Sequence, residues 1–272
     1  MPEGPEVRRH ADRVRRAVGG KTTDVVRFGL DRLAAFGPEL SGQRVDGVES
    51  RGKALIVHFE GGRSVYTHNQ LYGRWYVVGA GKTPSTRRQL RFGVETADKR
   101  ALLYSASDIE VLDRLEMDRH PFLARLGPDA LDPEVTADRI EARLDDRAFR
   151  GRQLGAVLLD QGFVAGLGNY LRSEILFFAG VAPERRAREL TPDRRRRLAE
   201  QVLEVTRRAY RTGGITVEDE LDRALKGEGL TRRARRHHVF ARAGRPCRRC
   251  GAAIGKQSSA GRRAYVCPRC QG

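Results

Sequence analysis

The sequence predicts an α+β fold of two domains, followed by a short cysteine-rich segment. Between residues 22 and 105, apolar residues recur with a period of two, which is the spacing of a half-buried strand. After residue 134 the period is close to 3.6, the spacing of an amphipathic helix. A chain of 272 residues is long enough for two cores. We therefore expect an N-terminal helix plus antiparallel β-sandwich first and a helical domain second.

The first domain is expected over residues 1–113. It begins with a helix over residues 5–18, which Gly19-Gly20 ends. The apolar stripe of this helix is Val7, Ala11, Val14 and Val18. Seven or eight short strands are expected to follow, separated by Gly, Asp and Pro clusters. They centre on Val25, Val45 and residues 54–57, 65–67, 75–78, 90–94 and 102–104.

Residues 114–134 are rich in proline and are expected to form a linker. The second domain is expected over residues 135–243. Its helices are expected near residues 136–146, 150–161, 168–179 and 192–211. The last helix has Thr191 as N-cap, Pro192 at its first position and Gly213 beyond its end.

Residues 213–243 have no clear period. Their basic run, residues 232–238, is interpreted as a solvated loop, which either touches phosphate or is an ordinary charged surface.

The formal net charge is +17 and the sequence pI is near 10.6. Such an excess favours a polyanionic partner, because each phosphate that is neutralised releases condensed counterions. An acidic protein or an anionic lipid is the alternative, but no helix has a bulky apolar face suited to a bilayer. No membrane span or signal peptide is found, so we expect a cytoplasmic protein.

All four cysteines lie within residues 244–272. Cys247 and Cys250 are separated by two residues, sixteen residues follow, and Cys267 and Cys270 repeat the spacing. Each pair places two thiolates on one tight turn, and four thiolates complete a tetrahedral zinc site with no open position. We expect one structural Zn²⁺, held by a hairpin.

A helical hairpin with two close glycine turns is expected at about residues 150–180. Gly166 and Gly168 precede a helix that starts at Asn169. Free backbone N–H groups at this helix start, with the Asn169 amide beside them, would form a seat for phosphate. The alternative is a helical hairpin that glycines merely turn.

The segment His68–Gly73 lies between two expected strands and contains Gln70, Leu71 and Tyr72. A polar, an aliphatic and an aromatic residue in succession could form a wedge that fills the gap left by an extruded base. Core residues at a corner of the sandwich are the alternative for Leu71 and Tyr72.

Together these motifs resemble the bacterial formamidopyrimidine-DNA glycosylase and endonuclease VIII family. The matching motifs are Pro2-Glu3-Gly4-Pro5-Glu6, Ser50-Arg51-Gly52-Lys53, Gly166-Leu167-Gly168-Asn169 and the cysteine hairpin. Residues 51–55, 68–73, 103–110 and 159–161 are most similar to the endonuclease VIII branch. The resemblance spans essentially the whole chain.

The resemblance implies a bifunctional glycosylase and abasic-site lyase, which acts as a monomer on double-stranded DNA that contains oxidised bases or abasic sites. Removal of Met1 would leave a secondary amine on Pro2 as the nucleophile, and an α-amino group has a pKa near 8. The implied roles are acid and base for Glu3, support of the terminus for Glu6, and phosphate contacts for Lys53, Gly168, Asn169 and Arg262.

Two alternatives remain. One is the same chemistry on oxidised purines, against which Gln70-Leu71-Tyr72 argues weakly. The other is a damaged-DNA-binding protein without activity, which would need neither Pro2 nor Glu3. Residues 213–244 are richer in arginine than the family pattern, so the range of substrates is an open question.

Overall fold

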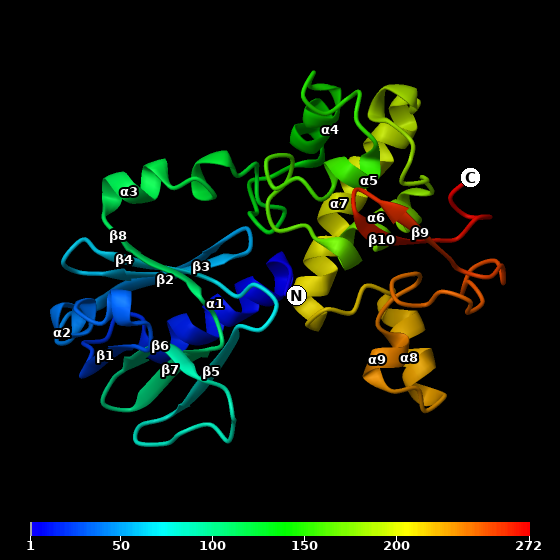
Figure 1. The fold of residues 1–272 in the computed structure, drawn as a ribbon. Helices are drawn as coiled ribbons and strands as arrows, with labels where there is room; N and C mark the ends of the chain where they lie inside the picture. Colours follow the sequence, from blue (N-terminus) through cyan, green and yellow to red (C-terminus); the bar gives the residue numbers. More distant parts are fainter. Residues whose placement is uncertain (1) are drawn as a thin grey trace. The chain divides into compact units, whose positions relative to one another are not determined.

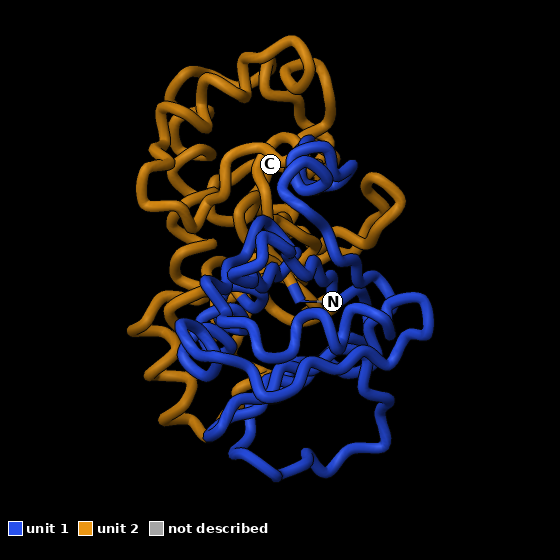
Figure 2. The backbone as a smooth tube through the Cα atoms, turned by 90° about the vertical axis from the view of Figure 1, so that its left-hand side faces the viewer, with its two compact units in different colours: residues 1–2, 6–125 blue, residues 3–5, 126–272 orange. Residues whose placement is uncertain are grey.

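The computed structural model describes residues 2–272; Met1, whose removal is expected above, lies outside them. The described chain forms two compact units (Figure 2). One contains residues 6–125 with Pro2, and the other contains residues 126–272 with Glu3–Pro5. Each unit has its own hydrophobic core. Within residues 2–272, no helix is long and apolar enough to cross a membrane.

The first unit is a β-sandwich with the helix α1 (Gly4–Val18) packed into its core (Figure 1). Its strands are β1 (Val25–Phe28), β2 (Val45–Arg51), β3 (Ala54–Phe59), β4 (Ser64–His68), β5 (Arg74–Gly79), β6 (Leu90–Glu95), β7 (Lys99–Tyr104) and β8 (Asp108–Leu112). Short helical segments accompany them: η1 (Asp31–Leu33), α2 (Phe36–Leu40), α3 (Arg114–Arg119) and η2 (Leu123–Arg125). The expected sandwich is confirmed.

Two four-stranded antiparallel sheets make up the sandwich. Their strand orders are β1-β6-β7-β5 and β2-β3-β4-β8. Side chains from both sheets, such as Leu55 and Phe92, share one core with Val7 and Val14 of α1. Strand β8 was not among the expected strands. Its sequence carries two carboxylates in five residues, and it lies at a sheet edge, where polar side chains face solvent.

The second unit is mainly helical. Its helices are α4 (Ala137–Asp145), α5 (Leu154–Val157), α6 (Asn169–Ala179), η3 (Ala187–Glu189), α7 (Pro192–Thr212), α8 (Asp219–Gly227) and α9 (Arg232–Arg235). Helices α4, α6 and α7 agree with the expected ranges. Helix α7 begins after Thr191, whose hydroxyl accepts a hydrogen bond from Arg194 N, and ends at Gly213 in the left-handed region.

Two expectations for this unit were wrong. The helix expected over residues 150–161 is a single turn, because the N–H groups of Leu154 and Gly155 donate to the carbonyls of Arg185 and Pro183 instead of continuing a longer helix. The basic run is not a plain loop, since Thr231 caps the short helix α9 at its start. The chain closes with the hairpin β9 (Gly255–Ser259) and β10 (Arg262–Val266).

Candidate functional site

Glu3 occupies the start of helix α6. Its Oε1 accepts a hydrogen bond of 2.8 Å from Tyr170 N, and its Oε2 accepts one of 3.2 Å from Leu171 N. The side chain is only 5% exposed. The positive end of the helix macrodipole stabilises the negative charge that a carboxylate carries. Glu3 is therefore a buried acid in a fixed orientation, although it lies near the chain terminus.

Three glycines let the terminal segment approach the turn before α6. Gly4 N donates to Gly166 O at 2.8 Å, and Gly166 has φ of 89°, a conformation that favours glycine. A Cβ atom on Gly4 would lie 2.9 Å from Gly166 Cα. A Cβ atom on Gly168 would lie 2.3 Å from Glu3 Cδ. The glycines that the sequence pointed to thus make room for Glu3.

The expectation of free N–H groups at this helix start is therefore wrong for two of them. Tyr170 N and Leu171 N are satisfied by the carboxylate of Glu3, which lies 167 and 168 residues away in the chain. A carboxylate and a phosphate are both anions that suit a helix N-terminus, and here the protein supplies the anion itself. The turn therefore positions an acid with these two N–H groups, and Gly168 and the Asn169 amide beside them stay the predicted phosphate contacts.

Asn169 links α6 to the cysteine hairpin. Its Nδ2 donates to Arg263 O at 3.0 Å, and its Oδ1 accepts from Arg172 Nη2 at 2.7 Å. Arg172 is fully buried and also donates to the carbonyls of Gly155, Ser259 and Arg263 at 3.0–3.1 Å. Burial, followed by the charge of Arg262, lowers the pKa of Arg172 to about 10, while Glu3 opposes this shift. Asn169 thus bonds to a buried cation whose pKa the charges of Arg262 and Glu3 also influence.

Arg262 lies at the tip of the hairpin, where it pairs with Ser259 across β9 and β10. Its side chain is exposed. The tip residues Ala260 and Gly261 have φ of 51° and 70°, which forms the tight turn. The hairpin therefore presents an exposed arginine, and the Arg172 contacts to Ser259 O and Arg263 O hold the hairpin near its tip.

The four cysteines meet in one cluster at the foot of this hairpin. The Sγ atoms of Cys247, Cys250, Cys267 and Cys270 all lie within 4.8 Å of one another. Tetrahedral zinc with Zn–S bonds of about 2.3 Å requires sulfurs roughly 3.8 Å apart, so the donor set and its spacing fit the ion. Cys247 and Cys267 are buried in the core of the second unit. One structural Zn²⁺ is bound by these four thiolates.

Lys53 lies on the turn between β2 and β3 in the first unit and is 8% exposed. Strand β4 ends beside it at His68. Burial is the main cause that lowers the pKa of His68; Asp108 opposes this shift and the charge of Lys53 adds to it. The geometry places a buried lysine next to a histidine at the same sheet end.

Residues 69–73, which follow His68, form a hydrogen-bonded turn with two apolar side chains at its tip. Gly73 N donates to Asn69 O at 2.7 Å, and Gln70 is held in the left-handed region, with φ of 49°, by hydrogen bonds to His68 and Ser107. Leu71 and Tyr72 are 61% and 69% exposed. They are therefore not core residues at a corner of the sandwich. The turn presents two large apolar side chains to solvent.

Pro2 and Glu6 lie at the two sides of the docked segment Glu3–Pro5. Both are half-buried, and Glu6 stands in the first turn of α1.

A buried acid that the sequence analysis missed anchors the region before the hairpin. Glu174 accepts hydrogen bonds of 2.7–2.9 Å from Thr216 Oγ1 and from the backbone N–H groups of His238, Val239 and Phe240. His237 Nδ1 lies 2.9 Å from Thr216 Oγ1. Burial lowers the pKa of His237 to about 4. The available signal was two charged residues, at positions 172 and 174, inside an otherwise apolar helix.

Comparisons with known proteins agree with this arrangement. Residues 1–107 match the family described as the formamidopyrimidine-DNA glycosylase N-terminal domain, and residues 126–220 match its H2TH domain. Residues 244–272 match the zinc finger found in FPG and IleRS. Endonuclease 8 of Klebsiella pneumoniae and endonuclease 8 of Enterobacter sp. are each 46% identical to the chain over 271 residues, covering 100% of both chains.

Solved structures share the fold. A complex of Lactococcus lactis Fpg with DNA containing an abasic site has a TM-score of 0.80 at 23% identity, and 99% of each chain is covered. A MutM complex with DNA containing carbocyclic 8-oxo-G has a TM-score of 0.80 at 22% identity, with 100% of each chain covered.

Proposed function

The chain belongs to the formamidopyrimidine-DNA glycosylase family that includes endonuclease 8, and on this basis we propose that it is a base-excision repair enzyme. It is a bifunctional DNA glycosylase and abasic-site lyase, it acts on double-stranded DNA, and its preferred lesions are oxidised pyrimidines. The observation that carries the proposal is the 46% identity to endonuclease 8 over the full length of both chains. Its relatives are bacterial proteins, so we place its work on the DNA of the bacterial cytoplasm.

We infer that the nucleophile is the secondary amine of Pro2 after removal of Met1. A free α-amino group titrates near pH 8, so a useful fraction carries a lone pair at neutral pH, unlike a lysine. The lone pair attacks C1′ of the damaged nucleotide, the glycosidic C–N bond breaks, and the base leaves with a proton taken from solvent. The C1′–ring oxygen bond then opens, which leaves an iminium between Pro2 and the sugar.

Glu3 is the acid and base next to this amine. Its carboxylate is fixed by two backbone N–H groups, so it need not be ordered when the sugar arrives. It takes the proton that the Pro2 nitrogen loses on attack, passes it to the sugar ring oxygen, and later assists removal of the C2′ proton. The electrons of that C–H bond expel the 3′ phosphate, and a second elimination expels the 5′ phosphate. Hydrolysis of the imine frees Pro2.

The remaining residues bring the nucleotide to this pair. Lys53, Asn169 with Gly168 at its turn, and Arg262 contact phosphates near the lesion, and Glu6 supports the terminal segment. Gln70, Leu71 and Tyr72 form the wedge, since an extruded base leaves a gap that apolar side chains can fill. The 61% and 69% exposure of Leu71 and Tyr72 supports this role. The zinc has no part in the chemistry and holds the hairpin that carries Arg262.

Borohydride trapping tests the proposal. The protein is mixed with a duplex that contains one oxidised pyrimidine, and borohydride is added to reduce any iminium to a stable amine. We expect a covalent complex with the wild type and none with Pro2→Gly combined with Glu3→Gln. A variant with one residue added before Pro2 should bind DNA but not be trapped, because its proline nitrogen is an amide.

Two outcomes would contradict the proposal. No trapped complex with the wild type would leave a DNA-binding protein without this activity. Trapping that survives in the variant with an added residue would place the nucleophile elsewhere than on the Pro2 nitrogen. A duplex with one oxidised purine, run in parallel, measures the lesion preference.

A further inference from the structure

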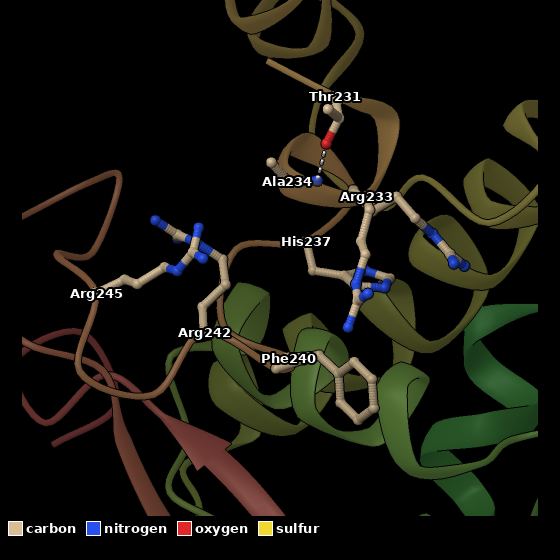
Figure 3. Close-up of a pocket in the computed structure, with 9 residues that line it drawn as sticks. Thr231, Arg233, Ala234, His237, Phe240, Arg242 and Arg245 are labelled. Carbon is tan, nitrogen blue, oxygen red and sulfur yellow. Dashed lines mark hydrogen bonds between the residues drawn. The ribbon is translucent and has the colours of Figure 1, made fainter.

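A cavity of about 450 Å³ lies in the second unit, between α9 and the chain that follows it to Arg245. Figure 3 shows Arg242 and Arg245 on one side, Arg233 and His237 on the other, and the ring of Phe240 below them. Arg236 also contributes to the wall. Four of the nine lining residues are arginines, and none of the nine carries a carboxylate.

Arg233 and Arg245 differ from the arginines just outside the cavity in how their charges are satisfied. Next to the cavity, Arg235 pairs with Asp222, and Arg249 pairs with Glu218 at 2.9 Å. In the described chain, the side chains of Arg233 and Arg245 are exposed and contact no acidic group. The nearby carboxylates therefore pair with arginines outside the cavity, while Arg233 and Arg245 face the cavity without a counterion.

Arg242 forms the buried part of the wall. It is 9% exposed, it donates to the carbonyls of His238 and Pro246, and its Nε has no partner among residues 2–272. Burial, then the charges of Arg248 and Arg245, lower the pKa of Arg242 to about 10, and Glu174 acts in the opposite direction. Like charges thus converge on a partly desolvated site, where an anion gains more than it would in open solvent.

The remaining walls fix the shape of the cavity. His237 is buried, and its Nδ1 lies 2.9 Å from Thr216 Oγ1, so the ring has a set orientation. The Phe240 ring packs on Tyr170 at 6.1 Å between ring centroids, and Phe240 N is held by Glu174. Tyr170 is also the residue whose N–H binds Glu3. Tyr170 therefore connects the two places. Its ring contacts Phe240 in the cavity wall, and its backbone N–H holds Glu3 at the start of α6.

We propose that this cavity is an additional phosphodiester-binding site, which holds a DNA backbone phosphate other than those next to the damaged nucleotide. Planar guanidinium groups match phosphate oxygens in pairs, and the cavity has room for a phosphate with its flanking sugar atoms. The inference rests on the proposed function, because it takes DNA as the partner. It gives the arginine-rich stretch after α8 a role in affinity rather than in chemistry.

The test is the salt dependence of binding to an undamaged duplex without terminal phosphates. One phosphate contact contributes a slope of about 0.9 to a plot of log K against log salt concentration. We expect Arg233→Ala with Arg245→Ala to reduce the slope by about that amount and to weaken binding about tenfold, as loss of a charged hydrogen-bonding pair does. Arg233→Lys with Arg245→Lys should retain the slope, because it keeps both charges.

The matched control is Arg147→Ala with Arg188→Ala. These arginines are exposed, belong to the same unit, do not line the cavity, and carry the same total charge. An equal loss of slope in this control, or an unchanged slope in the cavity variant, would overturn the site. Undamaged DNA keeps this result separate from borohydride trapping, so a failure of the proposed chemistry and a failure of this site are told apart.

Discussion

The acid of the site depends on a residue that has no side chain. Gly168 leaves the space that the Glu3 carboxylate fills, and the carboxylate in turn satisfies Tyr170 N and Leu171 N. An added methyl group at Gly168 would overlap Glu3 Cδ, and the acid could not keep its two hydrogen bonds. At the scale of single residues, the orientation of the Glu3 carboxylate, the proposed acid and base, is therefore set from both sides of one contact.

Gly168→Ala is predicted to reduce strand cleavage at an abasic site by about a hundredfold, since a displacement near 1 Å can cost that much. Overpacking should also lower the free energy of unfolding by about 1–3 kcal/mol. Cleavage rates and urea denaturation measure the two effects.

The control for this prediction is Gly227→Ala, at the last residue of α8, where an added Cβ meets nothing within 4 Å. It should leave cleavage unchanged and the free energy of unfolding unchanged or slightly raised. Full activity in Gly168→Ala would contradict the prediction, because it would show that Glu3 can be displaced without loss of cleavage.

Single residues were predictable from the sequence where their chemistry stands out. Glu3 and the four cysteines were found in this way, and the cysteine cluster is confirmed. The partner of Glu3 was not predictable, because a contact over 167 residues leaves no local trace. Arg172 and Glu174 were missed although both lie in an apolar helix, where a charge is expensive unless it is satisfied.

At the scale of elements, the turn between β4 and β5 is built to keep two apolar side chains in solvent. Its backbone is closed by the bond from Gly73 N to Asn69 O and braced by Arg88 Nη1, which donates to Tyr72 O at 2.7 Å. Exposed large apolar residues contribute little to the stability of a folded domain. We therefore expect Leu71 and Tyr72 to contribute to binding rather than to the stability of the domain.

Leu71→Ala with Tyr72→Ala is predicted to change the free energy of unfolding by less than about 0.5 kcal/mol, because both side chains are exposed. Trapping on a duplex with an oxidised pyrimidine should fall at least about tenfold, since the unstacking energy of the extruded base is no longer offset. Cleavage of a single-stranded abasic site, which has no base stack to fill, should change much less.

Leu115→Ala is the matched control, because Leu115 is 65% exposed and belongs to α3, outside the turn. It should alter none of these measurements. Equal loss of activity on both substrates in the turn variant would argue for a general defect rather than a wedge.

Elements were predictable where period and caps agree. Helices α4 and α7 have both an apolar period and an N-cap threonine, and their limits were found closely. Helix α6 is buried on all sides and was found from the glycines that precede it. Helix α5 was overestimated, because its first N–H groups bond to residues 183 and 185, which the apolar pattern does not report. Strand β8 was missed, because its edge position tolerates charges that resemble a loop.

The whole molecule has two cores that do not merge. One lies within the sandwich and contains the single tryptophan, Trp75, at 3% exposure. The other contains helices α4–α7 with Cys247 and Cys267. Loss of zinc should therefore act on one core and leave the other intact.

Cys247→Ser is predicted to lose zinc and to weaken DNA binding by more than about tenfold, because structural zinc contributes folding free energy directly. Trp75 fluorescence should stay native, since it reports the sandwich core. Metal analysis, a DNA titration and emission spectra test the three parts.

Ser258→Ala, at an exposed position of β9, should keep both zinc and affinity. A zinc-free Cys247→Ser protein with unchanged affinity would refute the role given to the hairpin.

The docking of Glu3–Pro5 on the second unit, while Pro2 and Glu6 group with the first, has a consequence for how this protein can be recombined. A chimera joined near residue 125 takes its acid from one parent and the glycine cradle and helix start from the other. Such hybrids should fail wherever the parents differ in this contact, even if both halves fold. Residues 3–5 and 166–171 must therefore come from the same parent, although they lie far apart in the sequence.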